Sequence, residues 1–152
     1  MIEAGIETDT RALGRSFGAL ADGVRKRVAR KTTGFAMTPA LKGARDRIQQ
    51  RTGTSAEALK KKTKVYQGGE VSITMVGIAK RASVVIDGKT HRPANIEHLL
   101  HEGYIHAKTG QYVPGTRYAE LSLQSARPEI ERRVLVKLDR EVTREVEKAR
   151  AG

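Results

Sequence analysis

Two histidines and a glutamate, His98, His101 and Glu102, form the arrangement in this sequence that best suits a metal ion. On a helix, residues three apart share one face, and imidazole and carboxylate groups ligate divalent cations. The arrangement departs from the His-Glu-x-x-His motif of metalloproteases, because Leu99 follows the first histidine and no general base lies inside the pair. A metal-dependent hydrolase is one hypothesis. The alternative, which we prefer, is that the histidines pack against a neighbouring loop or subunit.

Other catalytic patterns are missing from the sequence. It contains no G-x-S-x-G, and Gly68-Gly69 is not followed by Lys-Ser or Lys-Thr. The chain has no cysteine, which excludes disulfides, thiolate zinc sites, iron–sulfur clusters and cysteine nucleophiles. No spacing singles out a pair of carboxylates for acid–base catalysis. We therefore predict a protein that is not an enzyme and that has no cofactor and no bound metal.

Positive charge is concentrated in one segment. Residues 23–64 contain thirteen lysines and arginines and two acids, and so carry +11 of the net charge of +12. This asymmetry favours a polyanionic partner or an acidic protein surface, although a basic segment is also typical of a solvated helix face. No helix-turn-helix pattern stands out, so contact would be with phosphates and not with bases. The candidate contacts are Arg25, Lys26, Arg27, Arg30, Lys31, Arg45, Arg47 and Arg51.

The elements that position these residues fit one domain, residues 1–152. Apolar residues make up 38 % and aromatic residues 4 % of the chain, so the core should be small and aliphatic. Residues 1–9 alternate apolar and polar side chains, as a strand or an N-terminal arm would. The basic residues fall on a helix from about residue 24 to residue 50, which Pro39 should kink or split into a pair.

The middle of the chain is predicted to be a β-meander. A single helical turn over residues 56–61 precedes strands at 63–67 and 70–77, which flank the hairpin turn Gly68-Gly69. A third strand over residues 82–86 ends at Asp87-Gly88, another turn signal. These strands should pair sequentially and antiparallel.

The last third of the chain should contain two helices and a long loop. A short helix over 95–102, capped by Asn95, ends at Gly103, and a final amphipathic helix of about twenty residues begins near Pro128. Residues 104–125, between them, read as a long loop with strand fragments at 104–107 and 111–113. A loop of this length is usually functional. Its candidate subunit contacts are Tyr104, His106, Tyr112, Pro114 and Tyr118.

The predicted fold is therefore α+β. A small antiparallel β-sheet, a meander, packs against a long N-terminal helix, or a kinked helix pair, and against a C-terminal amphipathic helix. The longest strongly apolar run, Val84-Val85-Ile86, is too short to span a bilayer. The start of the chain lacks the basic and apolar regions of a secretory signal, so we expect synthesis in the cytoplasm and no membrane partner.

Three landmarks in this order of elements resemble a known family. The basic half ends in Arg51-Thr52-Gly53-Thr54-Ser55-Ala56-Glu57-Ala58-Leu59, and His98-Leu99-Leu100-His101-Glu102-Gly103 precedes the loop. Ala126-Arg127-Pro128 then precedes the last helix. Over roughly residues 10–149 the chain resembles the HK97 gp10-like family of tailed-bacteriophage proteins, which are neck, tail-completion or head–tail joining components.

The resemblance implies a structural virion protein that acts by assembly in the neck or tail. Copies of the chain would form a ring, six-fold rather than twelve-fold, between the portal and the tail. Its neighbours would be head-completion proteins and tail-tube or tail-terminator proteins. The basic segment would face packaged DNA or the acidic rim of an adjacent ring. The alternative is a small basic nucleic-acid-binding protein that uses the helix 24–51.

Overall fold

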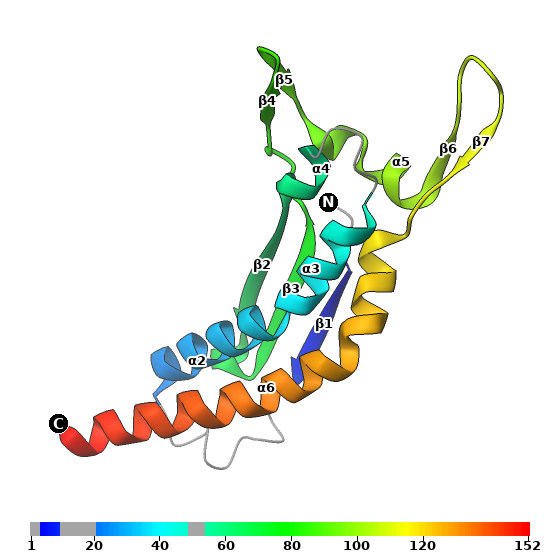
Figure 1. Ribbon diagram of the computed structural model, residues 1–152. Coiled ribbons are helices and arrows are strands. Elements are labelled where there is room, and N and C mark those ends of the chain that lie inside the picture. Colours follow the sequence, from blue (N-terminus) through cyan, green and yellow to red (C-terminus); the bar gives the residue numbers. More distant parts are fainter. Residues whose placement is uncertain (1–3, 10–20, 49–53) are drawn as a thin grey trace.

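One antiparallel sheet and three helices make up most of the protein. The computed structural model describes residues 4–9, 21–48 and 54–152. The sheet has three strands, which lie in the order β1 (Ala4–Asp9), β3 (Val71–Ile78) and β2 (Leu59–Tyr66). The helices that lie along it are α2 (Asp22–Ala36), α3 (Thr38–Arg47) and α6 (Tyr118–Ala151) (Figure 1). This confirms the predicted α+β architecture.

Strand β2 shows that the helices cover one face of the sheet. Along β2 the more exposed side chains alternate with better-covered ones, which begin with the fully buried Leu59. The two faces of a strand alternate with a period of two residues, so Lys60, Lys62 and Lys64 belong to the uncovered face. The hairpin predicted at Gly68-Gly69 is confirmed, because β2 pairs with β3 from Leu59↔Ile78 to Tyr66↔Val71 around a short 3₁₀ turn.

The third strand of the sheet is the N-terminal β1 and not the predicted strand at 82–86. Residues Val84–Ile86 form β4, which pairs with β5 (Lys89–His91) in a separate hairpin. The physical reason is the Asp87-Gly88 turn. Both residues have positive φ, 50° and 72°, which is the geometry of a two-residue hairpin loop. The strand therefore folds back on the residues that follow it, and the predicted meander ends after two strands.

The predicted basic helix is a pair of helices that meet at Met37. Pro39 lies in the first turn of α3, where its missing N–H breaks no helical hydrogen bond. Thr38 Oγ1 donates to the Phe35 carbonyl at 2.8 Å, so one carbonyl at the end of α2 is paired. The pair, one of the two predicted alternatives, is thus confirmed. The helical turn that follows, α4 (Thr54–Ala58), is shorter than predicted because Leu59 already belongs to β2.

A short helix and a second hairpin follow β5. A 3₁₀ turn over Pro93–Asn95 leads into α5 (Glu97–Glu102), and β6 (Gly103–Ile105) pairs with β7 (Tyr112–Pro114). The predicted cap by Asn95 is wrong, because Ile96 occupies the N-cap position and no side chain caps the helix. Gly103 ends α5 as predicted, with φ 101°.

The predicted loop 104–125 is wrong in its second half, because α6 begins at Tyr118 and residues 118–125 are helical. The good helix formers after Tyr118, such as Leu121 and Leu123, outweigh the turn signals that precede them. Pro128 lies inside α6 and does not open it. A proline inside a helix removes a backbone hydrogen bond, and α6 bends between the yellow and orange parts of Figure 1. The bent helix follows both α3 and α2.

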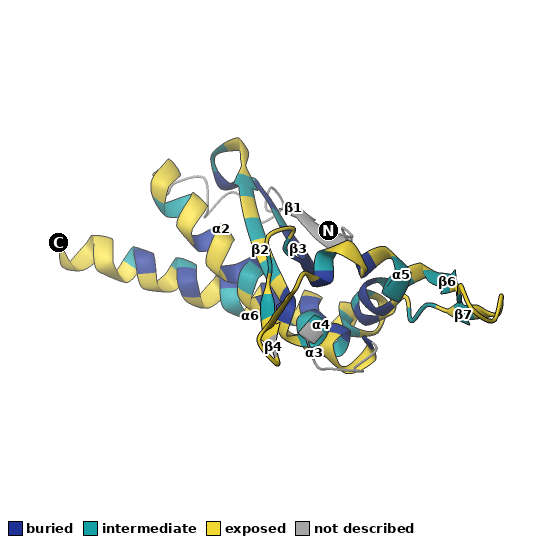
Figure 2. Cartoon of the chain, turned by 90° about the horizontal axis from the view of Figure 1, so that it is seen from above, coloured by how far each residue is buried: buried dark blue, intermediate teal, exposed yellow. Residues whose placement is uncertain are grey.

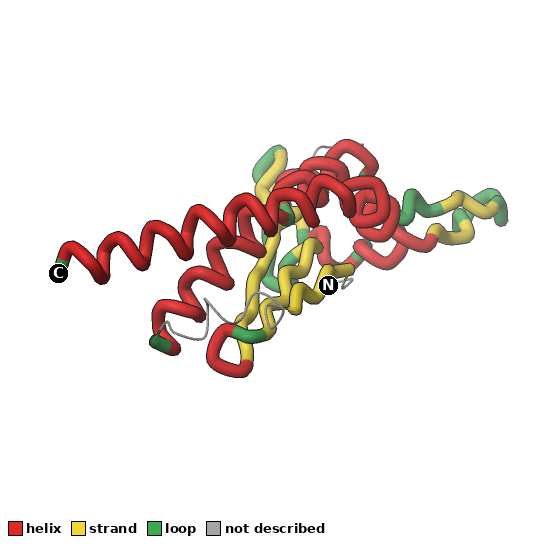
Figure 3. Tube along the Cα trace, turned by 90° about the horizontal axis from the view of Figure 1, so that it is seen from below, coloured by secondary structure: helices red, strands yellow, loops and turns green. Residues whose placement is uncertain are grey.

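Two apolar clusters of unequal size hold these elements together. The larger lies among α3, the first half of α6 and the ends of β2 and β3, and includes Met37, Leu59, Ile78 and Ile130. The smaller joins α2 to the outer half of α6. Figure 2 shows buried residues between helices and sheet and exposed residues on both hairpins and at the C-terminal end. In Figure 3 the end of α6 extends beyond the sheet, away from the β6–β7 hairpin.

Candidate functional site

The contact between α2 and α6 contains ion pairs that join the two helices. Arg27 Nη2 lies 3.0 Å from Glu145 Oε2, and Lys31 Nζ lies 3.8 Å from Glu141 Oε2. Both glutamates are buried, with 3 % of Glu141 and 7 % of Glu145 exposed. We call these four residues the charged seam. Two of the candidate polyanion contacts, Arg27 and Lys31, are therefore engaged within the chain.

Each buried carboxylate of the charged seam has a second cation within α6. Lys137 Nζ lies 2.8 Å from Glu141 Oε1, and Lys148 Nζ lies 3.2 Å from Glu145 Oε1. Two cations around each carboxylate offset the cost of removing its charge from water. Arg27 and Lys31 of α2 thus have a structural role, because they neutralise two acids that are buried on α6.

The charge balance of the charged seam sets the pKa values of its acids. A hydrogen bond from Lys137 lowers the pKa of Glu141, with the charges of Lys137 and Lys31 adding to it against the opposing effect of burial. Burial raises the pKa of Glu145, but Lys148 and Arg27 outweigh it, so this pKa also lies below the usual 4.5. A depressed folded-state pKa stabilises the fold above the unfolded value, and this contribution is lost as the pH falls through the folded value.

Acid should therefore destabilise the protein partly through the charged seam. We expect the free energy of unfolding to fall as the pH drops below the ordinary value of 4.5, because Glu141 and Glu145 then take up protons in the unfolded state while they stay charged in the folded state. The double substitution Glu141→Gln/Glu145→Gln should lower stability at pH near 7 and flatten this part of the profile. Urea unfolding across the pH range measures both. Glu131→Gln, in an exposed pair with Arg127, is the control and should leave the slope unchanged. Equal slopes in all three proteins would contradict this account.

Four of the other candidate basic residues fall into three groups. Arg25 forms an ion pair with Asp22 one turn earlier in α2. Lys26 and Arg30 are exposed and have no ion-pair partner among the residues that the structure describes. Arg51 lies outside the described residues. The candidate contacts are therefore not one continuous free surface.

Two candidate contacts on α3 make hydrogen bonds within the chain. Arg45 Nη2 donates to the Leu59 carbonyl at 3.1 Å, which ties α3 to the start of β2. Arg47 donates to the Gly43 carbonyl at 3.3 Å and to Ser125 Oγ at 2.9 Å, which ties α3 to α6. Both remain exposed overall, so these bonds orient their side chains without removing them from solvent.

The β6–β7 hairpin carries four of the five candidate subunit contacts. Tyr112 is 63 % exposed, and Ile105, its cross-strand neighbour, is 69 % exposed. Pro114 is exposed, whereas Tyr104 and His106 are half-buried. The backbone N–H of His106 donates to the Gln111 carbonyl at 2.8 Å and closes the tip. The hairpin therefore presents apolar side chains near its tip.

The fifth candidate, Tyr118, is a buried residue and not a loop contact. It is fully buried, and its hydroxyl donates to Glu97 Oε1 at 2.8 Å. Glu97 Oε1 also accepts the backbone N–H of Ile78 at 3.1 Å. Burial raises the pKa of Tyr118 above its usual 10.0, and the hydrogen bond and charge of Glu97 raise it further, so the hydroxyl is a proton donor at neutral pH. Glu97 thus links β3, α5 and α6.

The two histidines of the metal hypothesis have different environments. His98 is exposed, whereas both ring nitrogens of His101 are buried, and its ring meets Tyr118 edge-on at 5.5 Å between centroids. Across residues 4–9, 21–48 and 54–152, no cluster of three or more histidine and acidic side chains is arranged to hold a metal ion.

Comparison of the chain with protein-family models, with curated proteins and with solved structures finds no match. Over the part of the chain that the structure describes, no helix has both the length and the apolar character of a membrane span.

Proposed function

We propose that this protein is a structural subunit of a tailed-phage neck that forms a ring between the head and the tail and acts by assembly rather than catalysis. The observation that carries the proposal is the pair of hairpins at one end of the molecule (Figure 1). Each exposes an aliphatic side chain near its tip, Val85 in β4 at 67 % and Ile105 in β6 at 69 %. The proposal also draws on the sequence resemblance to neck and tail-completion proteins.

The hairpins suit contacts between copies of the chain. Both pair only within themselves and join no strand of the main sheet among the described residues. A two-stranded hairpin is marginally stable in water, and burial against another subunit would stabilise it. A contact between a hairpin and a different patch on the next copy is heterologous, and it closes into a ring when the rotation is suitable.

The nucleic-acid-binding alternative that uses the helix 24–51 receives less support from the geometry. Arg27 and Lys31 neutralise buried acids of α6, and Arg45 is bonded to the start of β2. A salt series of duplex binding tests this alternative through variants of the helix itself, such as Lys26→Ala/Arg30→Ala, because phosphate contacts made there would weaken steeply with salt and would be lost in the variant.

The direct test of the neck proposal is the copy number of this chain in purified tailed particles, measured by quantitative mass spectrometry against the portal. We expect about six copies per particle, or about twelve if the ring is twelve-fold. Absence of the chain from particles would overturn the proposal.

Ring formation by the purified chain tests whether the hairpins make the contact between copies. Val85→Ser/Ile105→Ser removes one exposed aliphatic side chain from each hairpin, and we expect it to raise the concentration needed for ring formation at least tenfold, or about 1.4 kcal/mol. Leu135→Ser/Val136→Ser makes the same chemical change at residues of α6 that are 59 % and 49 % exposed, and should assemble normally. Native mass spectrometry over a dilution series measures both. A larger loss in the α6 variant would place the contact on α6 and not on the hairpins.

A further inference from the structure

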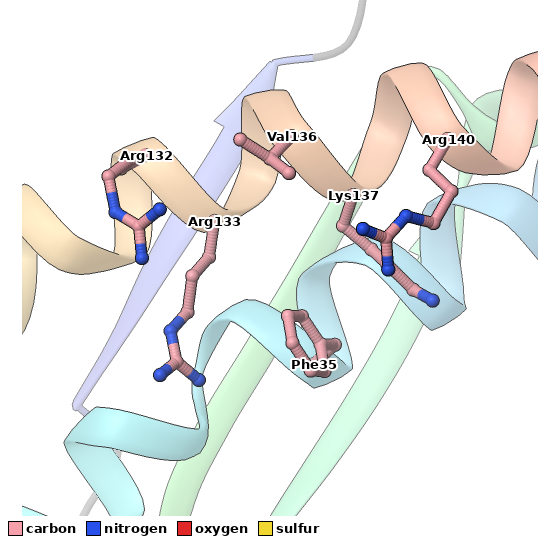
Figure 4. Close-up of a pocket in the computed structure, with 6 residues that line it drawn as sticks. All are labelled: Phe35, Arg132, Arg133, Val136, Lys137 and Arg140. Carbon is pink, nitrogen blue, oxygen red and sulfur yellow. The ribbon is translucent and has the colours of Figure 1, made fainter.

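A pocket between the end of α2 and the middle of α6 has an aromatic floor and a basic rim. Phe35 is 46 % exposed, although an aromatic ring gains stability from burial. The pocket, which we call the Phe35 pocket, is lined by Phe35, Arg132, Arg133, Val136, Lys137 and Arg140. Figure 4 shows Phe35 between the side chains of Arg133 and Lys137, with Arg140 beside Lys137. None of its four cations was among the predicted contacts.

Two positively charged side chains lie against the Phe35 ring. The guanidinium carbon of Arg133 lies 5.4 Å from the ring centroid, and Lys137 Nζ lies 5.5 Å from it. Lys61 of β2 lies nearby, because its Nζ donates to Thr38 Oγ1 at 2.7 Å, three residues beyond Phe35. Burial lowers the pKa of Lys61, and the charge of Arg133 lowers it further. An anion bound here would relieve the repulsion among these cations.

The acids beside the pocket do not balance its cations. Glu129 accepts hydrogen bonds from Arg132 and Arg133, the shortest at 2.6 Å, and Glu141 accepts from Lys137. Arg140 has no ion-pair partner among the described residues. Counting Lys61, five cations face two carboxylates, and the pocket keeps an excess of positive charge.

The arrangement of the excess positive charge in a row along α6 suits an extended polyanion as the ligand. The exposed Arg132, Arg140 and Arg144 form a row along one side of α6. With a helical rise of 1.5 Å per residue, Arg140 lies about 12 Å along the helix from Arg132, and Arg144 lies about 6 Å beyond Arg140. A single carboxylate would occupy one position of such a row, whereas a phosphodiester chain offers a negative charge at each nucleotide. Guanidinium groups also match phosphate oxygens in geometry. A second copy of this chain is a poor occupant, because its net charge is +12.

We propose that the Phe35 pocket and the arginine row beside it bind the phosphate groups of a nucleic-acid backbone. Phe35 acts as a positioning residue that holds Arg133 and Lys137 together, and Arg132 and Arg140 supply the exposed contacts. This inference does not depend on the neck proposal, because it concerns the purified chain.

The test is binding of a labelled DNA duplex of about 20 base pairs, followed by fluorescence anisotropy between about 50 and about 200 mM salt. Arg132→Ala/Arg140→Ala should lower affinity about tenfold at the middle of this range and reduce the slope of log K against log salt by about two. Lys89→Ala/Lys108→Ala removes the same charge from the two hairpins and should change affinity by less than about twofold. Phe35→Leu keeps an apolar side chain and should weaken binding about threefold without lowering the melting temperature.

Three results would overturn the proposal. Equal losses in the pocket and hairpin variants would mean that net charge alone attracts DNA. Competition by inorganic pyrophosphate as effective as that by duplex phosphate would assign the pocket to a small free phosphate. Stronger binding of a polyglutamate peptide than of DNA, lost in the pocket variant, would assign it to an acidic protein.

Discussion

Glu97→Ala is expected to lower the free energy of unfolding by about 3 kcal/mol, because it leaves two buried donors without their acceptor. These donors are the hydroxyl of Tyr118 and the backbone N–H of Ile78, at 2.8 and 3.1 Å from Glu97 Oε1. Glu97 is 2 % exposed, so the two donors are buried and bulk water does not take the place of the lost carboxylate. Urea unfolding measures the loss.

Tyr118→Phe is the matched control for this prediction. It removes one donor and keeps the ring, so it should cost about 1 kcal/mol. The edge-on contact of the ring with His101 is retained. A Glu97→Ala variant whose stability equals that of Tyr118→Phe would mean that the Ile78 hydrogen bond contributes nothing.

Gly115→Ala should destabilise the protein by about 3 kcal/mol, at the upper end of the range for overpacking. A Cβ on Gly115 would overlap the carbonyl oxygen of His101 and lie 2.5 Å from Glu102 C. These are backbone atoms and cannot rotate away. The neighbouring residues depend on the close approach, because Thr116 N donates to the Leu100 carbonyl and Arg117 N to the His101 carbonyl, both at 3.0 Å. Moving this segment away from α5 would break both bonds.

Gly23→Ala is the control, since a Cβ there meets nothing within 4 Å. In the first turn of α2 it should stabilise the protein by up to about 1 kcal/mol. Thermal unfolding of the two variants beside the unchanged protein measures both effects. A Gly115→Ala variant that melts with the unchanged protein would show that the hairpin base and α5 can separate without cost.

The fold could be predicted from the sequence where one local signal was unopposed. Gly68-Gly69 between alternating residues predicts the β2–β3 hairpin, and Pro39 predicts the break between α2 and α3. Prediction failed where two signals competed. Pro128 is favoured at helix starts, yet the helix begins ten residues earlier, because the helix formers after Tyr118 and packing against α3 both support residues 118–127 as helix.

The candidate site was harder to predict, because pairing between elements distant in sequence decides which charges are free. The apolar residues from Ile130 to Val146 recur every four positions, whereas a helix turns every 3.6. The apolar stripe therefore drifts off the buried face after Leu138, where Glu141 and Glu145 occupy the buried positions and pair with Lys31 and Arg27. The Phe35 pocket was missed for a related reason. Its arginines have acids in their own helix, and only the fold brings Phe35 and Lys61 beside them.

The two unequal apolar clusters give α6 a gradient of local stability. Its first half is anchored by the larger cluster, whereas its outer half rests on Val28 and Leu138, with Val24 and Val142 beside them, and on the charged seam. Proteins open locally where buried apolar contacts are fewest. We therefore expect the amides of the outer turns of α2 and α6 to exchange with solvent before those near Tyr118. Because Arg27 and Lys31 of the charged seam are about half-exposed, we expect added salt to increase this fraying more than it affects the Tyr118 end.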